Sequence, residues 1–426
     1  MRQRPNWNYW DASNLIKKGS LDIGDGYRAK NSEMGDEGFP FARAGNVNKG
    51  FHFDDADILS KESVDKAKAA GKLSRPGDVT FTSKGTFGRF AYVSERTRQF
   101  VYSPQLCYWR VKDHKLIDSR FLYYWMQGPD SMNQLVQIKG LTDMADYVSL
   151  TNQRRMWLSA PPLPTQQKIA AILSAYDDLI ENNLRRIKIL EAMAQNLYRE
   201  WFVKFRFPGH QHARFTDSPL GRIPEGWEVN VLGKVADQIR DAVNPGSVDP
   251  ETPYFGLEHL PRKSISLADW GLASEVQSTK LLFKKGDVLF GKIRPYFHKV
   301  GVAPLPGICS SDIIVIRPRA ADWFGLILGC TSSVEFVEHA TATSQGTKMP
   351  RANWDVLVKY QIPMPPQPIL GQFNEFMSEI VSQLHNFVFR NQTLRRTRDL
   401  LRPRLISGKV DVSVLDIAVP EEDNKA

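Results

Sequence analysis

Residues 161–205, "PPLPTQQKIAAILSAYDDLIENNLRRIKILEAMAQNLYREWFVKF", give the strongest secondary-structure signal in the chain. After the opening prolines, the chain contains neither Pro nor Gly for about forty residues from Thr165 onward, as a long helix requires. Positions that are mostly apolar recur there at heptad spacing in two neighbouring rows. One row is Leu173, Ile180, Ile187, Ala194 and Trp201, and the other is Tyr176, Asn183, Leu190 and Leu197. Two such rows predict a helix that buries a seam against another helix.

The end of the chain carries the same pattern. After Pro368 the two rows are Phe373, Ile380, Phe387, Leu394 and Leu401, and Met377, Leu384, Asn391, Arg398 and Leu405. Each helix packing on its own domain is the simpler arrangement, but a forty-residue helix is roughly 60 Å long, more than a domain of about 150 residues covers. We therefore predict an intramolecular coiled coil, antiparallel because each helix begins where its own domain ends.

Asn183 and Asn391 interrupt the apolar rows near the middle of the two predicted helices. A polar residue in such a seam is often a register device, which lowers stability but excludes slipped pairings. Since the two asparagines stand in different rows, an antiparallel pairing places their amides side by side. We hypothesise that they set the register; unchanged register and oligomeric state in the Asn183→Leu and Asn391→Leu variants would contradict this.

The chain also repeats itself. Segments match in chain order, at an offset that falls from 213 residues (Pro40 to Pro253) to 201 residues (Pro162 to Pro363). Between them, "GDVTFTSKG" from Gly77 matches "GDVLFGKIR" from Gly286, Arg110 matches Arg317, and Gly140 matches Gly346. Five matches in register order indicate a tandem duplication.

The duplication predicts the domain organisation. Globular parts at 1–164 and 207–365 carry short strand-like runs broken by Gly and Pro, mixed with helical segments, which is typical of an α+β domain used twice. Long helices at 165–206 and 366–408 follow these domains, and a polar tail occupies 409–426. The expected fold is pseudo-twofold symmetric, with two α+β domains separated by an antiparallel coiled coil.

Two glycine-rich segments imitate nucleotide sites. Residues 284–297, "KKGDVLFGKIRPYF", have the glycine and lysine spacing of a P-loop, but a strand-like run fills the gap. Ile293 stands where a Mg²⁺-binding hydroxyl follows Lys292, and Pro295 disfavours the helix that should come next. Residues 24–29, "GDGYRA", begin like a dinucleotide fingerprint without the required strand and helix. Neither predicts nucleotide binding.

Composition excludes several other classes. The 426 residues are 42% hydrophobic and 24% charged, and no apolar run is long enough for a membrane span. The N-terminus lacks a secretory signal, so we expect a cytoplasmic protein. Cys107, Cys309 and Cys330 are widely spaced and are interpreted as reduced core thiols, while His210 and His212 lack further ligands nearby. No metal site and no catalytic centre is predicted.

A net charge of +9 and a pI near 9.3 favour a polyanionic partner, although dispersed cations more often keep a protein soluble. Cationic, hydroxyl and aromatic side chains on loops suit phosphate and base-edge contacts. A solvated loop explains any single residue nearly as well, but the recurrence in both copies favours binding. The predicted DNA-binding residues are Tyr27, Arg28, Lys84, Thr86, Arg89, Lys139, Lys292, Arg294, Tyr296, His298, Lys348 and Arg351.

These features together resemble the DNA-specificity subunit of type I restriction-modification enzymes. The resemblance rests on residues 161–205 quoted above, "IPEGWEVNVLGKVAD" (223–237), "KKGDVLFGKIRPYFHKV" (284–300) and "NQTLRRTRDLLRPRLISGKVDV" (391–412), with the paired proline clusters. It spans essentially the whole chain. The first-copy loop "FTSKGTFGRFAYV" departs from the pattern because it lacks Lys-x-Arg-Pro, so individual base contacts do not transfer between copies.

The resemblance implies two target-recognition domains that each read half of a split double-stranded DNA site, with the helices acting as a ruler. It implies two modification subunits that dock on the helices, bind S-adenosylmethionine and methylate adenine, and restriction subunits that use ATP and Mg²⁺. The chain itself would bind no cofactor. Two alternatives stay open: a self-contained DNA-modifying enzyme, which would act without added subunits, and a coiled-coil scaffold, which salt-dependent duplex binding would exclude.

Overall fold

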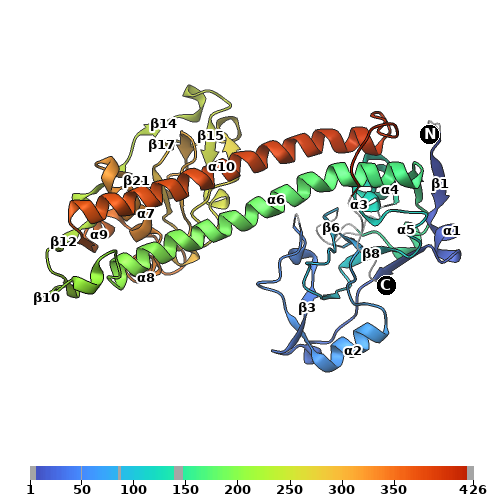
Figure 1. Ribbon diagram of the computed structural model, residues 1–426, viewed down its shortest axis with the longest axis horizontal. Coiled ribbons are helices and arrows are strands. Elements are labelled where there is room, and N and C mark those ends of the chain that lie inside the picture. Colours follow the sequence, from blue (N-terminus) through green and yellow to red (C-terminus); the bar gives the residue numbers. More distant parts are fainter. Residues whose placement is uncertain (1–5, 49, 85–87, 139–146, 420–426) are drawn as a thin grey trace. The chain divides into compact units, whose positions relative to one another are not determined.

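The computed structural model describes residues 6–48, 50–84, 88–138 and 147–419 (Figure 1). The chain folds into two compact units: unit 1 is Met1–Leu179 with Leu394–Ala426, and unit 2 is Ile180–Thr393. Both boundaries fall inside the long helices α6 (Leu163–Tyr198) and α10 (Gln367–Ile406). Each unit therefore contains one globular domain and a segment of both long helices.

Unit 1 is an α+β domain. Its strands are β1 (Asn8–Asp11), β2 (Leu21–Asp25), β3 (Gly38–Ala42), β4 (Ile58–Ser60), β5 (Val79–Thr82), β6 (Phe90–Tyr92), β7 (Val101–Tyr102), β8 (Leu106–Val111) and β9 (Trp157–Ala160). Its shorter helices are α1 (Ala12–Lys17), α2 (Lys61–Ala69), α3 (Ser119–Met126), α4 (Pro129–Ile138) and α5 (Leu150–Gln153). The strands form sheets in the orders β2-β8-β5-β6, β4-β3-β7 and β1-β9.

Unit 2 repeats this plan with additions. Its strands are β10 (Phe215–Ser218), β11 (Gly221–Pro224), β12 (Glu228–Val231), β13 (Ala236–Ile239), β14 (Ala242–Val243), β15 (Pro253–Phe255), β16 (Gly271–Leu272), β17 (Lys280–Phe283), β18 (Val288–Gly291), β19 (Val300–Val302), β20 (Gly307–Cys309), β21 (Ile313–Pro318) and β22 (Gln361–Met364). Its shorter helices are α7 (Phe324–Thr331), α8 (Val334–Ala342) and α9 (Trp354–Leu357). The sheets are β13-β21-β18-β19, β14-β17-β20-β15-β16, β12-β22 and the hairpin β10-β11.

The sequence repeat corresponds to one sheet formed twice. The order β2-β8-β5-β6 in unit 1 has the same connectivity as β13-β21-β18-β19 in unit 2. The register agrees as well, because Val79 pairs with Trp109 and Val288 with Ile316. A parallel strand pair recurs too, β3 with β7 and β15 with β20. The predicted α+β fold with tandem domains is confirmed.

The two long helices run antiparallel within each unit, where Figure 1 shows α10 beside α6. In unit 2 the Arg186 guanidinium lies 5.7 Å from the ring centre of Phe387, and the rings of Trp201 and Phe373 are 5.6 Å apart. In unit 1 the Arg398 guanidinium pairs with Asp177. Lower-numbered residues of one helix thus meet higher-numbered residues of the other, as an antiparallel coiled coil requires.

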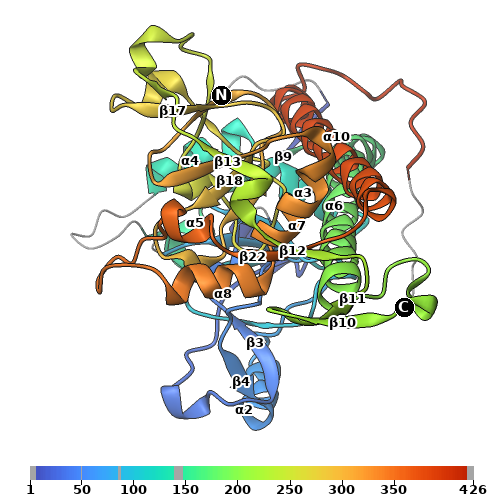
Figure 2. The ribbon, with the colours of Figure 1, turned by 90° about the vertical axis from the view of Figure 1, so that its left-hand side faces the viewer.

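Local chemistry explains where these helices end. After Tyr198, α6 continues as one turn of π-helix (Arg199–Val203). It then stops where Phe205 adopts a φ of 56° and Gly209 a φ of 87°, since left-handed residues close helices. Gly408, with a φ of 68°, follows the end of α10 in the same way. In unit 2, α7 packs against both long helices through Gly325 and Gly329 (Figure 2).

The segment from residue 409 onward was expected to be a polar tail, and its first part is not. Val412 is only 2% exposed and packs in the core of unit 1 with Leu405 and Ile406. The Lys168 ammonium donates hydrogen bonds of 2.8 Å to the carbonyls of Ser413 and Leu415. The apolar side chains of Val412 and Ile417 and two backbone acceptors therefore hold this segment on unit 1.

The three cysteines are free and buried, which confirms their interpretation as core thiols. Burial raises the pKa of the Cys309 and Cys330 thiols to about 12. Among the helices in the described parts of the chain, none combines the length and apolar character of a membrane span.

Candidate nucleic-acid interface

The Gly-Asp-Val segments begin the central strands β5 and β18, and their aspartates are buried. In unit 1 the Arg110 side chain donates two hydrogen bonds to Asp78, of 2.6 and 2.8 Å. In unit 2 the Arg317 side chain donates to Asp287 at 2.8 and 2.6 Å. Both carboxylates also accept a backbone N–H from three residues earlier, at 2.9 and 2.7 Å. The most strongly repeated residues therefore hold the sheet, and the loops that follow are free to differ.

In unit 2 the loop after β18 has strained backbone. Arg294 and His298 adopt φ values of 49° and 51° on either side of a 3-10 turn, Pro295–Phe297. Lys263, with a φ of 56°, lies beside them and donates its N–H to the His298 carbonyl at 2.8 Å. Left-handed backbone is uncommon for residues other than glycine and tends to gather at functional sites.

Cations and aromatic rings meet on this loop. The Phe297 ring lies 4.2 Å from the Arg262 guanidinium carbon and 5.9 Å from that of Arg294, both within cation–π range. Tyr296 contacts Phe297 edge to face at 4.8 Å and is 51% exposed. Tyr296 on this loop is thus an open aromatic ring, and the guanidinium groups of Arg294, on the same loop, and Arg262, on a neighbouring loop, both lie against Phe297.

His298 differs from its neighbours because it is buried. Its Nε2 lies 2.9 Å from the Ser332 carbonyl, so this nitrogen carries the proton and donates. Burial lowers the pKa of the imidazole. The ring holds the loop against the α7–α8 connection and does not reach the surface as a base-reading group would.

Of the remaining predicted cations of unit 2, Lys292 starts the 292–299 loop, where its carbonyl accepts the Ala352 N–H at 2.9 Å, and Lys348 and Arg351 lie on an adjoining segment. Ile293 forms an isolated bridge with Arg351, and the Arg294 N–H donates to the Pro350 carbonyl at 2.8 Å. The Arg351 guanidinium lies 3.6 Å from the Asp312 carboxylate. Lys348 is exposed on the same segment. The structure therefore brings the backbone of the 292–299 loop next to that of 345–352.

In unit 1 the loop after β5 is built differently. Lys84 forms an isolated bridge with Tyr147, and its ammonium lies 5.9 Å from the Tyr147 ring centre. Arg89 is drawn inward, because its N–H donates to Thr82 Oγ1 at 3.0 Å and its guanidinium to the Val47 carbonyl at 3.4 Å. Thr86 and Lys139 lie outside the described residues.

Tyr27 and Arg28 contact their own sequence neighbours. The Tyr27 hydroxyl donates to Glu33 at 2.8 Å, and this hydrogen bond raises the pKa of the tyrosine. Arg28 is 3.3 Å from Asp25 and its side chain is 78% exposed. In the neighbouring segment that imitated a dinucleotide site, the glycine at position 26 has a steric reason. A Cβ there would lie 2.1 Å from the Ser103 backbone.

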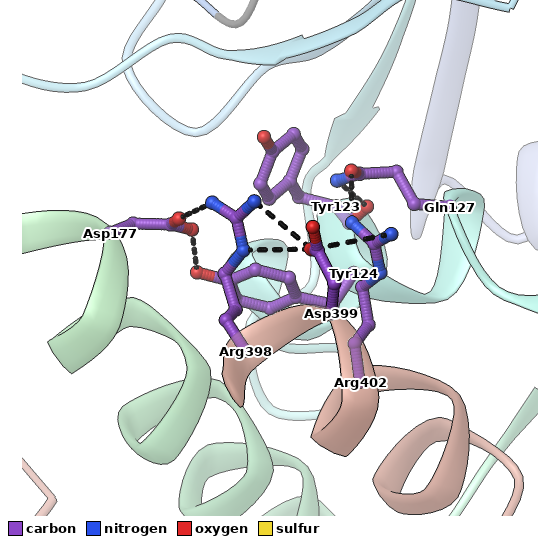
Figure 3. A network of polar contacts seen from close by, with 7 residues as sticks. All are labelled: Tyr123, Tyr124, Gln127, Asp177, Arg398, Asp399 and Arg402. Carbon is purple, nitrogen blue, oxygen red and sulfur yellow. Dashed lines mark hydrogen bonds and ion pairs between the residues drawn. The ribbon is translucent and has the colours of Figure 1, made fainter. Parts of the chain in front are cut away.

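A polar network joins α3 to both long helices in unit 1 (Figure 3). Asp177 on α6 accepts a 2.5 Å hydrogen bond from the Tyr124 hydroxyl and pairs with Arg398 on α10. Arg402 donates to Gln127 at 2.7 Å. The hydrogen bonds of Tyr124 on α3 and of Gln127 directly after it thus fix the first helix after the sheet onto both long helices within unit 1.

The two asparagines of the coiled-coil seam meet in unit 2. Asn183 Nδ2 donates to Asn391 Oδ1 at 2.9 Å, and both residues are buried. Each amide therefore satisfies part of its hydrogen-bonding capacity only when the helices are in this register, which is how a register device works. Whether the pair sets the register remains a prediction.

An apolar groove runs along the helix pair of unit 2. Its volume is about 410 Å³, and most of the side chains that line it are apolar. The residues that line it are Leu190, Met193, Leu197, Phe376, Glu379, Ile380 and Gln383. Met193 is 52% and Phe376 48% exposed. Large exposed apolar side chains in one place mark an interaction surface.

The described residues contain no group of three His, Cys, Asp or Glu side chains arranged to hold a metal ion. The predicted residues placed above supply cations, a buried imidazole and aromatic rings. Sequence reasoning selected Arg294 and Tyr296 but missed Arg262 and Tyr147. Their positions depend on contacts between loops distant in sequence, and the short basic stretch "PRK" around Arg262 was the available signal.

Comparisons with known proteins agree with these features. A family model described as "Type I restriction modification DNA specificity domain" matches residues 18–192. The chain is 25% identical over 310 residues to the specificity subunit of type I restriction enzyme MjaIX from Methanocaldococcus jannaschii, covering 70% of each chain. It is 25% identical over 441 residues to the HindI specificity subunit of Haemophilus influenzae, covering 87% of this chain and 94% of that protein.

The fold is shared with a solved structure. The S subunit of a type I restriction-modification system from M. genitalium superposes with a TM-score of 0.59 at 12% identity. The match covers 95% of this chain and 98% of that chain.

Proposed function

Because this chain belongs to the family of type I restriction-modification DNA specificity subunits, we propose that it binds double-stranded DNA and that each unit recognises one half of a two-part site. The cation–aromatic cluster that Arg294 and Phe297 on the strained 292–299 loop form with Arg262 on a neighbouring loop carries the proposal. In unit 1 the loop at the equivalent strand end presents Lys84 beside Tyr147. Cations position DNA through phosphates, and stacked or edge-presented side chains read bases.

The role is non-catalytic, and catalysis would belong to partner subunits. Two modification subunits would bind S-adenosylmethionine and methylate adenine, and restriction subunits would use ATP and Mg²⁺. The complex would work in the cytoplasm, on the cell's DNA. Mapping methylated adenines in DNA from cells that carry the chain with its modification subunit tests the proposal. We expect a two-part motif with a fixed gap; methylation at a continuous motif would contradict it.

The apolar groove of unit 2 would receive an apolar helix of a modification subunit. Replacing the half-exposed Met193 by Asp places a charge in that groove, and burying an unpaired charge is costly. We expect Met193→Asp to abolish co-purification with the modification subunit while the isolated chain keeps its unfolding midpoint. The matched variant Met349→Asp changes a similarly exposed methionine, 49% exposed and outside the groove, and should co-purify normally.

The length of the helices would set the gap between the two half-sites. Removing one heptad from each of α6 and α10 would shorten the coiled coil by roughly 10 Å, about three base pairs at a duplex rise of ~3.4 Å. We expect a shorter spacer in the methylated motif or lost binding. A functional variant with an unchanged spacer would refute the role of the helices as a ruler.

A further inference from the structure

Arg262 lies on the loop that follows a 3-10 turn, Leu257–His259, in unit 2. Its guanidinium carbon is 4.2 Å from the centre of the Phe297 ring, the shortest such distance found in the described part of the chain. A guanidinium stacked on a ring keeps its N–H edge free, and that edge donates two parallel hydrogen bonds in one plane. Arg262 is therefore arranged as a donor without an acceptor inside its own unit.

The charge balance around this stack supports an external acceptor. Within the described residues, no carboxylate pairs with Arg262 or with Arg294, which lies 5.9 Å from the same ring. Arg294 Nε is also buried without a hydrogen-bond partner. Several other arginines of unit 2 pair with a carboxylate, for example Arg319 with Asp237 at 2.8 Å. Two neighbouring unpaired guanidinium groups favour a negatively charged or acceptor-rich partner.

Backbone and side-chain hydrogen bonds tie the loop that carries Arg262 to two neighbouring elements. The N–H of Lys263 donates to the His298 carbonyl at 2.8 Å, which ties it to the Phe297 loop. Further on, the Ser264 hydroxyl and the Ser266 N–H donate to Glu191 of α6, at 2.5 and 2.9 Å. A donor fixed in this way loses little freedom on binding, so its contact adds more to affinity and specificity.

We propose that Arg262 is a DNA-contacting residue of unit 2 whose stacked guanidinium donates two hydrogen bonds to one planar acceptor. That acceptor is either the O6/N7 edge of a guanine or a backbone phosphate, since both accept from an arginine fork. The inference rests on the proposed function and deepens it by assigning a specificity residue that the sequence did not indicate.

The test selects bound sequences from a random duplex pool, using the full-length chain co-expressed with its modification subunits. If Arg262 reads guanine, both Arg262→Ala and Arg262→Lys lose preference at one position by roughly tenfold to a hundredfold, with the other positions unchanged. If Arg262 contacts phosphate, Arg262→Ala weakens binding to all sequences and lowers the salt slope by about one. Arg262→Lys then keeps most of the affinity, because the charge remains.

Arg319→Ala is the matched control, since Arg319 is also exposed but already paired. It should change neither the selected sequences nor the salt slope. Arg262 is exposed, so Arg262→Ala should keep the wild-type unfolding midpoint. An Arg262→Ala variant with the same selected sequences, affinity within twofold and the same salt slope overturns the assignment alone. A wild-type protein that selects no two-part sequence overturns the proposed function together with it.

Discussion

The two units attach the same helix of the duplicated fold to the coiled coil with opposite chemistry. In unit 1 the sixth residue of α3 is Tyr124, whose hydroxyl reaches Asp177 on α6. In unit 2 the sixth residue of α7 is Gly329, and the ring that fills the contact comes from Tyr198 on α6. A Cβ at Gly329 would lie 2.5 Å from that ring. The aromatic ring of this contact thus comes from the shorter helix in unit 1 and from the long helix α6 in unit 2.

The duplicated units share their sheets but not the side chains that attach them to the long helices. Sheet order and register agree between the units, and so does the buried Asp–Arg pair that starts the central strand. The contacts on the coiled coil agree only in position, because a polar network in unit 1 corresponds to a mainly apolar, close-packed contact in unit 2, where the Gly325 N–H donates one hydrogen bond of 2.8 Å to Asn374 Oδ1. Packing needs complementary shape and satisfied polar groups, and different side-chain pairs meet that need equally well.

The largest expected effect comes from breaking the shared ion pair. Arg110 is 8% exposed over a fully buried Asp78, whereas Arg317 is 27% exposed over Asp287. Removing the arginine leaves a buried carboxylate unpaired, so we expect Arg110→Ala to lower the free energy of unfolding of unit 1 by about 3–5 kcal/mol. Arg317→Ala should cost unit 2 less, about 1–3 kcal/mol, because water reaches Asp287 more easily.

Hydrogen exchange of the full-length chain separates these effects, because peptides of β8 and β21 report on units 1 and 2 respectively. Arg319→Ala is the control, since its pair with Asp237 is half exposed and should contribute nothing measurable. Equal costs in the two units would show that burial does not distinguish the pairs.

Acid should affect unit 2 through a buried histidine of α10. Burial and the nearby Lys285 charge lower the pKa of His385 to about 4, although a backbone hydrogen bond to Val302 opposes the shift. The unfolded chain takes up this proton near pH 6.5 and the folded one near pH 4. The contribution of the neutral His385 ring to the free energy of unfolding is therefore fully present above pH 6.5. It falls by about 3 kcal/mol as the pH drops towards 4.

Urea unfolding of the wild type and of His385→Gln at pH 7.5 and 4.5 measures this contribution. We expect the wild type to lose more stability than the variant between the two pH values. The comparison must be made between variants, because burial raises the pKa of Glu191 and its protonation works in the opposite direction. Parallel losses in both proteins would remove His385 as the cause.

The glycine contact of unit 2 should tolerate no added methyl group. Because a Cβ at Gly329 meets the buried Tyr198 ring, we expect Gly329→Ala to lower the unfolding free energy by about 1–3 kcal/mol, as overpacking does. Gly371 is the matched control, since it lies within α10 and a Cβ there meets nothing within 4 Å. Gly371→Ala should stabilise by about 0.5–1 kcal/mol. A neutral Gly329→Ala would show that the contact repacks.

The long helices and the repeat were predictable because their signals are local and redundant. Heptad rows extend over many residues, and the repeated Gly-Asp-Val segments mark equivalent strands. The recognition loops were less accessible, because Arg262 becomes significant only when folding brings it onto Phe297. His298 shows the converse: a polar residue on a loop turned out to be buried, since its partner Ser332 lies on another segment.

The smallest expected effect concerns the network of unit 1, and it tests whether polar attachment is weaker than apolar attachment. In Asp177→Asn, Arg398 keeps its pair with Asp399 at 3.0 Å, so no buried charge is left alone and the cost should be about 1 kcal/mol. Tyr124→Phe removes only the hydroxyl and should cost a similar amount. If the two act through one hydrogen bond, the double variant costs less than the two single costs combined, as urea unfolding would measure. Strict additivity would mean that Tyr124 and Asp177 stabilise unit 1 independently. Tyr124 would then resemble Tyr198 of unit 2 only in the packing of its ring.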